Sequence, residues 1–292
     1  MTDKNGLFGR LALFATALIW GTSFVVLKFA LGSMGTMWVL AIRFSVSAIL
    51  LTLAAGKRLK KMNRTAFKGS VLMGLCLAAA YIIQTFGLVY TTPSKNAFLT
   101  ATYCVLVPFM AWGIYKRKPN GTNIIAAVLC LAGIGFISLN NGLGQVNVGD
   151  MLTLSCGIFY SLQIILMEHY ISQGESLSIS AVQFTAAAAV CWLGALLFES
   201  APGAMSAEAW AGIMYLSVVC TAVCFFLQAW GMKYTPSSTA AMIMTLESVF
   251  GTLFSVLLYH EALTPRLIFG FALVFLAVLI SETKLSFLHK RA

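Results

Sequence analysis

The segment "QTFGLVYTTPS" at residues 84–94 has a near copy, "QAWGMKYTPSS", at residues 228–238. Three residues recur at the same spacing of 144 positions: Gln84, Gly87 and Tyr90 return as Gln228, Gly231 and Tyr234. In both copies a Thr-Pro pair follows the tyrosine, Thr92-Pro93 and Thr235-Pro236, which is typical of an N-cap hydroxyl and a first-turn proline. The repeated segment predicts that two related halves each begin a helix at an equivalent point.

Composition places both halves in a membrane. Of 292 residues, 60% are hydrophobic and 10% are charged, whereas soluble proteins carry roughly a quarter of charged residues. Apolar runs of about 20 residues are long enough to cross the hydrocarbon as helices. Ten such runs cover residues 10–31, 36–55, 68–90, 94–115, 122–140, 149–172, 178–198, 209–232, 237–259 and 264–283. We therefore expect an all-α polytopic membrane protein with ten transmembrane helices.

The repeat divides these spans into two groups of five. The halves are residues 1–140 and residues 150–283, followed by a basic tail at 284–292. Because five is odd, the second half must enter the membrane from the opposite side, so the copies form two inverted five-helix repeats. Glycines Gly87 and Gly231 would let neighbouring helix backbones approach closely near the repeated turn. Two inverted halves can exchange conformations, which is the basis of alternating access.

The net charge of +10 sets the orientation. Most Lys and Arg residues lie before the first span, at 57–68, at 116–118 and in the tail, all on one side of a chain that crosses ten times. Because basic residues are retained in the cytoplasm, we expect a multi-pass protein of the cytoplasmic (inner) membrane with both termini and the 284–292 tail cytoplasmic. The charge is thus a topology signal with some attraction to anionic membrane lipid, and no nucleic-acid partner is expected.

Sequence motifs for cofactor chemistry are missing. All seven cysteines fall inside proposed spans as small packing residues, without the spacing of a disulfide framework or a zinc site. The histidines His169, His260 and His289 are scattered, with no HExxH, and no G-x-x-x-x-G-K-[ST] sequence for ATP occurs. We expect no enzyme, no metal and no cofactor.

Several longer motifs resemble one transporter superfamily. They are "LIWGTSFVVLKF" in the first span, "AIRFSVSAILL" in the second, "YTTPSKNAFLTATYCVLVPF" at the fourth and "YTPSSTAAMIMTLESVFGTLFSVLLYHE" at the ninth. Together they resemble the drug/metabolite transporter superfamily, EamA type, over nearly the full length. The resemblance implies a ten-helix inverted-repeat permease with a central cavity that moves small metabolites, often amino acids and commonly outward. Ser248, where a proline often follows the glutamate, and the segment 117–119 depart from the commonest pattern.

Candidate substrate-binding residues follow from depth, since inverted-repeat transporters bind near the midplane. Trp and Tyr normally favour the membrane interfaces, so rings at mid-depth indicate either a lined cavity or helix packing. The residues placed within about 5 Å of the centre by helix rise are Trp20, Gly21, Tyr81, Tyr103, Phe159, Tyr160 and Glu247. Three glutamines, Gln84, Gln163 and Gln228, either face this cavity or join helices.

Charged residues inside the spans are the sharpest candidates. Glu247 is the one carboxylate near mid-membrane, where a charge costs on the order of 3 kcal/mol. We expect it to bind a substrate ammonium or to exchange a coupling proton; a hydrogen bond between helices is the structural alternative. Lys28, Arg43 and Lys95 are candidates for charge pairing. Lys28 can instead snorkel to the membrane interface, whereas Arg43 lies too deep to do so freely and has carbonyl hydrogen bonds as its alternative. Lys95 lies at a helix start, where it either attracts a carboxylate or is a plain surface lysine.

Taken together, the sequence predicts a secondary transporter, or permease, for a small metabolite. An amino acid or related amphipathic compound is the leading substrate class, with alternating access as the expected mechanism, export as the expected direction and protons as a candidate coupling ion. The alternative is a lipid or polyprenyl-linked carrier flippase of the same fold, which would need a cavity open sideways to lipid.

Overall fold

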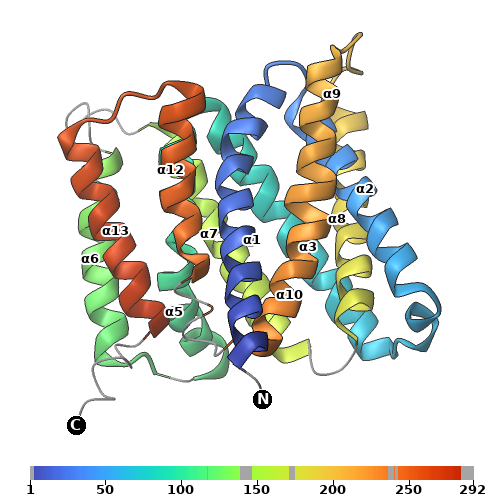
Figure 1. The fold of residues 1–292 in the computed structure, drawn as a ribbon, viewed down its shortest axis with the longest axis horizontal. Coiled ribbons are helices and arrows are strands. Elements are labelled where there is room, and N and C mark those ends of the chain that lie inside the picture. The colour runs from blue at the N-terminus through green and yellow to red at the C-terminus, as the bar shows by residue number, and fades with distance from the viewer. Residues whose placement is uncertain are drawn as a thin grey trace.

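The computed structural model describes residues 3–116, 118–138, 147–170, 175–235, 240 and 243–283, and every regular element in these ranges is a helix (Figure 1). The first half contains α1 (Asp3–Ala30), α2 (Thr36–Ala55), η1 (Gly56–Lys61), α3 (Arg64–Tyr90), α4 (Pro93–Ala101), α5 (Tyr103–Tyr115) and α6 (Gly121–Ser138). The second contains α7 (Val148–Tyr170), α8 (Ser176–Phe198), α9 (Ala207–Met214), η3 (Tyr215–Val223), α10 (Cys224–Tyr234), α12 (Leu246–Tyr259) and α13 (Pro265–Thr283).

Within the described ranges, eight helical segments are long and apolar enough to cross a membrane, and two shorter apolar helices, Leu246–Tyr259 and Pro265–Ser281, accompany them. The prediction of an all-helical membrane protein is confirmed at this level. In Figure 1, α1 begins and α13 ends at the lower end of the bundle, while the α1–α2 and α12–α13 connections lie at the upper end.

The repeated Thr-Pro segment begins α4. Thr92 occupies the N-cap with extended backbone and Pro93 is the first helical residue, because a proline there sacrifices no hydrogen bond. One detail of the prediction is wrong: the Thr92 hydroxyl caps nothing and is buried without a partner among the described residues. In the second copy Pro236 lies outside the described residues.

The predicted span 94–115 is interrupted in the structure. Thr102 separates α4 from α5, with φ −61° and ψ −17°. Further along α5, Pro108 lacks the N–H that would bond to the carbonyl of Cys104. The freed carbonyl instead accepts a hydrogen bond from Ser281 Oγ of α13 at 3.0 Å. The bond that Pro108 cannot make within α5 is therefore replaced by a bond from the neighbouring helix α13.

A second departure from regular helix lies in η3, a π-helical stretch between α9 and α10. Its wider turns leave carbonyl groups available to other helices. Ser217 O accepts from Ser47 Oγ of α2 at 2.8 Å, and Cys220 O accepts from Trp20 Nε1 of α1 at 2.7 Å. The π-helical stretch thus joins α1 and α2 through polar contacts in the bundle interior.

The close approach predicted at Gly87 and Gly231 is present. A Cβ atom at Gly87 would lie 2.9 Å from the carbonyl oxygen of Gly149 on α7. A Cβ atom at Gly231 would lie 2.9 Å from the carbonyl oxygen of Gly9 on α1. Only glycine permits such contact between helix backbones. The α3–α7 and α1–α10 pairs therefore touch through glycines at both repeated segments.

Replacing Gly87 with alanine is expected to destabilise the protein by about 1–3 kcal/mol, because the methyl group would meet Thr153 Oγ1 and the Gly149 carbonyl. The matched control is Gly135→Ala, where nothing lies within 4 Å of the new Cβ. Thermal unfolding of both variants in the same detergent measures the difference. Equal melting temperatures for the two variants would show that the α3–α7 contact tolerates separation.

Candidate functional site

A cavity of about 160 Å³ lies in the bundle interior. Its walls come from both halves of the chain, from α1, α2, α3, α4, α5, α7, α10 and α12. Eight residues singled out from the sequence as candidate substrate-binding residues line it: Trp20, Tyr81, Gln84, Tyr103, Tyr160, Gln163, Gln228 and Glu247. The fold thus brings together side chains that are separated by more than half of the chain.

Two other predicted residues do not line this cavity. Gly21 faces α12, where an added Cβ would collide with Phe250 and approach the backbone nitrogen of Gly251 to 2.9 Å. Its small size therefore serves the α1–α12 contact. Phe159, the neighbour of Tyr160 on α7, is absent from the lining because adjacent helical residues point about 100° apart.

One wall of the cavity is a hydrogen-bonded set of aromatic and amide groups. Gln84 Nε2 donates to Thr100 Oγ1 at 2.9 Å, and Tyr160 OH donates to Gln84 Oε1 at 2.7 Å. Tyr160 also packs against Tyr81 and Tyr103, with ring centroids 5.6 and 5.7 Å apart. Because both ends of the Gln84 amide are occupied, this wall is fixed in shape, and Gln84 joins helices as well as facing the cavity.

Arg43 enters the cavity from α2 and is only 3% exposed. Its Nε donates to Thr221 Oγ1 of η3 at 2.9 Å, and Thr221 Oγ1 in turn donates to Leu216 O at 2.9 Å. The guanidinium carbon lies 5.0 Å from the centroid of the Tyr81 ring. Arg43 was expected to pair with a charge or to donate to carbonyl groups; here a hydroxyl and an aromatic face hold it beside the cavity.

Glu247 lies in the first turn of α12, two residues after a break in helix geometry at Thr245. It lines the central cavity and also a second cavity of about 360 Å³, and Gln228 and Tyr103 line both. The structure gives no hydrogen bond or ion pair to Glu247, Gln163 or Gln228 within its described ranges. All three side chains line the central cavity, so a ligand bound there would contact them.

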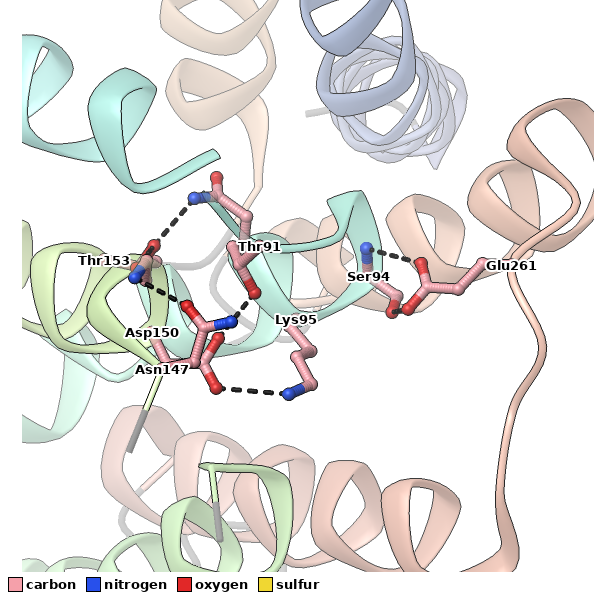
Figure 2. Close-up of polar contacts among 9 residues, drawn as sticks. Thr91, Ser94, Lys95, Asn147, Asp150, Thr153 and Glu261 are labelled. Carbon is pink, nitrogen blue, oxygen red and sulfur yellow. Dashed lines mark hydrogen bonds and ion pairs between the residues drawn. The ribbon is translucent and has the colours of Figure 1, made fainter. Parts of the chain in front are cut away.

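The first turn of α4 is tied to α7 at the end of the bundle that carries the α12–α13 connection, which we name the Asp150 end. Figure 2 shows Lys95 and Thr91 converging on the fully buried carboxylate of Asp150. Lys95 Nζ lies 3.2 Å from Asp150 Oδ2, and Thr91 Oγ1 donates to Asp150 Oδ1. The expected charge partner of Lys95 is thus a residue that sequence analysis had not singled out.

Further contacts close the same end. Glu261 accepts hydrogen bonds from the backbone N–H and the hydroxyl of Ser94 on α4 (Figure 2). It also accepts one from the Ser255 hydroxyl of α12. Lys28 Nζ donates to three carbonyl oxygens at the end of α3, those of Leu88, Val89 and Thr91. Lys28 therefore neutralises the negative end of a helix instead of pairing with a carboxylate.

Several cavity residues were missed from the sequence. Ser23, Thr100 and Phe225 line the cavity at three positions from the predicted residues Trp20, Tyr103 and Gln228. Helical residues three apart share a face, so extending each prediction by one turn would have found them.

Comparison with known proteins identifies the fold's relatives. The family described as EamA-like transporter family matches residues 7–139 and again residues 147–283. An uncharacterized transporter of Archaeoglobus fulgidus is 33% identical over 276 residues, covering 94% of this chain and 85% of the relative. The uncharacterized transporter YoaV of Bacillus subtilis is 21% identical over 274 residues, covering 90% of this chain and 93% of the relative.

A solved crystal structure shares the fold, with a TM-score of 0.69 at 17% identity, and covers 95% of this chain and 98% of that chain. The family matches span most of the sequence, and the helices that they cover enclose the cavity described above. This chain therefore belongs to the EamA-like transporter family and is a multi-pass membrane transporter.

Proposed function

We propose that this protein is a secondary transporter that moves a small metabolite across the cytoplasmic membrane by alternating access, with net export. An amino acid or related amphipathic compound is the proposed substrate class. The observation that carries the proposal is the interior cavity, which combines aromatic walls with the opposite charges of Arg43 and Glu247. Ligand sites have this character, a largely apolar lining with a few placed polar groups.

Equivalent features in the two halves support an inverted repeat. The Gly87–Gly149 contact between α3 and α7 corresponds to the Gly231–Gly9 contact between α10 and α1. The breaks at Thr102 and Thr245 are 143 positions apart and have nearly equal backbone angles, φ −61° and −62°. Interrupted helices near the midplane are typical binding elements of inverted-repeat transporters, and Tyr103 and Glu247 lie beside these breaks.

Closure of one end supports alternating access. At the Asp150 end, Asp150 and Glu261 hold the first turn of α4 against α7 and α12. At the opposite end, the ion pair given for the described residues, Arg58–Glu175, has side chains 63% and 41% exposed, so it is screened by water. By the placement of basic residues, we propose that the Asp150 end is extracellular and must open to release substrate.

A flippase for lipid-linked carriers is the second candidate, favoured by a groove of about 480 Å³ between α5, α6 and α7. Its lining is almost wholly apolar, with residues such as Phe109, Leu131 and Ile158, and none of its described lining residues is charged. Such a groove suits an acyl or prenyl chain, whereas a charged headgroup would find its partners only in the central cavity. The metabolite transporter is therefore the first choice.

The experiment that tests the proposal is a thermal-shift screen of the purified protein against a panel of amino acids, amines and organic acids, followed by counterflow in liposomes. A ligand that binds only the native state at 100 times its Kd stabilises by about 2.7 kcal/mol. We expect at least one amino acid both to raise the melting temperature and to drive saturable counterflow. Stabilisation by lipid-linked carriers alone, without metabolite counterflow, would favour the flippase.

A further inference from the structure

Arg43 has more hydrogen-bonding capacity than the protein uses. A guanidinium carries five N–H donors, and in the described residues the Nε–H alone is given a partner, Thr221 Oγ1. The side chain is 97% buried by accessible area, yet it lines the central cavity. Thr221 holds the Nε side of the guanidinium, which leaves the edge formed by the two terminal nitrogens without a hydrogen-bond partner among the described residues. This edge has the geometry that binds a carboxylate through two parallel hydrogen bonds.

Glu247 is the opposite charge in the same cavity, but it does not pair with Arg43. No Arg43 nitrogen lies within 4.0 Å of a Glu247 oxygen, although both side chains line the same cavity. An uncompensated charge in a membrane interior is costly even by insertion scales. Two opposite charges kept apart across one cavity are therefore expected to find their partners in a ligand placed between them.

Resting on the transport function proposed above, we propose that Arg43 and Glu247 bind the two ends of a small dipolar ion. The ligand's carboxylate lies on the terminal nitrogens of Arg43, and its ammonium group lies on the Glu247 carboxylate. Arg43 thereby becomes a specificity-determining residue that excludes simple amines, while Glu247 excludes simple carboxylic acids. This arrangement selects zwitterions over compounds with a single charge.

The remaining residues that line the cavity limit the size and polarity of the ligand. Trp20 and Phe225 pack with ring centroids 5.6 Å apart and, with Tyr81, form an apolar wall beside Arg43. A cavity of about 150 Å³ is known to hold one benzene ring, so the 160 Å³ here accommodates a similarly small molecule. Gln163 and Gln228 add neutral hydrogen bonds. A small α-amino acid, aliphatic or with one ring, fits these limits.

Matched ligand sets test the proposal. The probes are L-alanine, L-leucine and L-phenylalanine, their amines (ethylamine, 3-methylbutylamine and 2-phenylethylamine) and their acids (propionate, 4-methylpentanoate and 3-phenylpropionate). Calorimetry with the full-length wild-type protein is expected to show at least one amino acid bound about tenfold or more tightly than either of its analogues, because each analogue leaves one buried charge unpaired.

Two variants should each lose recognition of one end of the ligand, either its carboxylate or its ammonium group. Arg43→Gln is expected to weaken binding of the amino acid and the acid about tenfold or more and to leave amine binding within about twofold. Glu247→Gln is expected to weaken the amino acid and the amine by the same factor and to spare the acid. The exposed pair provides matched controls: Arg58→Gln and Glu175→Gln should change none of the affinities.

The outcomes separate this inference from the proposed function. If both cavity variants weaken all three ligand types equally, the charges are structural and the dipolar site is wrong, even where amino-acid counterflow persists. If none of the three amino acids binds while another metabolite shows counterflow, the inference fails and the transporter stands. Should Arg43→Gln not fold, Arg43→Lys replaces it. The site is supported if this variant still prefers the amino acid over the amine but binds the amino acid more weakly. The site is overturned if this variant loses that preference while its binding of the acid is unchanged.

Discussion

Replacement of Lys95 by methionine is expected to lower the free energy of unfolding by about 3 kcal/mol, which is the range for removing one partner of a buried ion pair. The Asp150 carboxylate is fully buried, and without Lys95 it would retain the Thr91 hydroxyl and the favourable start of α7. Lys95 itself is 13% exposed at its side chain and can reach water if Asp150 is lost. The lysine substitution should therefore be more harmful than Asp150→Asn.

A double-mutant cycle measures this asymmetry. We expect the combined Lys95→Met and Asp150→Asn variant to be more stable than Lys95→Met alone, because the second change removes the stranded charge. Thermal unfolding of the four proteins in one detergent gives the coupling. The matched control is Arg58→Met in the exposed ion pair with Glu175, where the loss should stay within about 1 kcal/mol. Additive effects of the two changes at Lys95 and Asp150 would contradict the pairing.

The same contact has a functional consequence. Asp150 and Glu261 approach the first turn of α4 from two sides, so this turn cannot move away from α7 and α12 until their contacts break (Figure 2). If the Asp150 end opens during transport, these polar contacts are part of the free-energy difference between the two conformations. Weakening them shifts that equilibrium towards the open form without altering the cavity.

The membrane class could be predicted because composition and the lengths of apolar runs are read directly along the sequence, without knowledge of which helices become neighbours. Most candidate cavity residues were likewise predictable, since depth along a helix follows directly from position in the sequence. The rotation of a helix about its axis does not follow from depth. That is why Gly21 and Phe159 were grouped with Trp20 and Tyr160, although the structure turns them away from the cavity.

The polar contacts could not be predicted because they depend on which helices become neighbours. Asp150 looks like an ordinary charge at the start of a span, and only the packing of α4 against α7 buries it beside Lys95. The π-helical stretch that orients Arg43 through Thr221 has no proline or glycine to mark it in the sequence. Its carbonyl groups are stabilised by α1 and α2, so tertiary contacts determine it.

Glu247→Gln is expected to raise the melting temperature and to lower transport at least tenfold. The wild-type carboxylate lies inside the bundle and is given no hydrogen bond or ion pair by the described residues, so a neutral amide of the same shape removes a desolvation cost. The same change deletes the charge that a substrate ammonium group needs. Opposite effects on stability and activity are the signature of a residue kept for function.

The measurement pairs thermal unfolding with counterflow of the best ligand in liposomes at several imposed proton gradients. Glu175→Gln is the control, since that glutamate lies in an exposed ion pair at the opposite end from Asp150. A binding role predicts that the residual activity of Glu247→Gln keeps the wild-type response to the proton gradient, whereas a coupling role predicts that the response disappears. A fall in both stability and transport would instead assign Glu247 to holding α12 against its neighbours, because a structural hydrogen bond cannot be lost without weakening the fold.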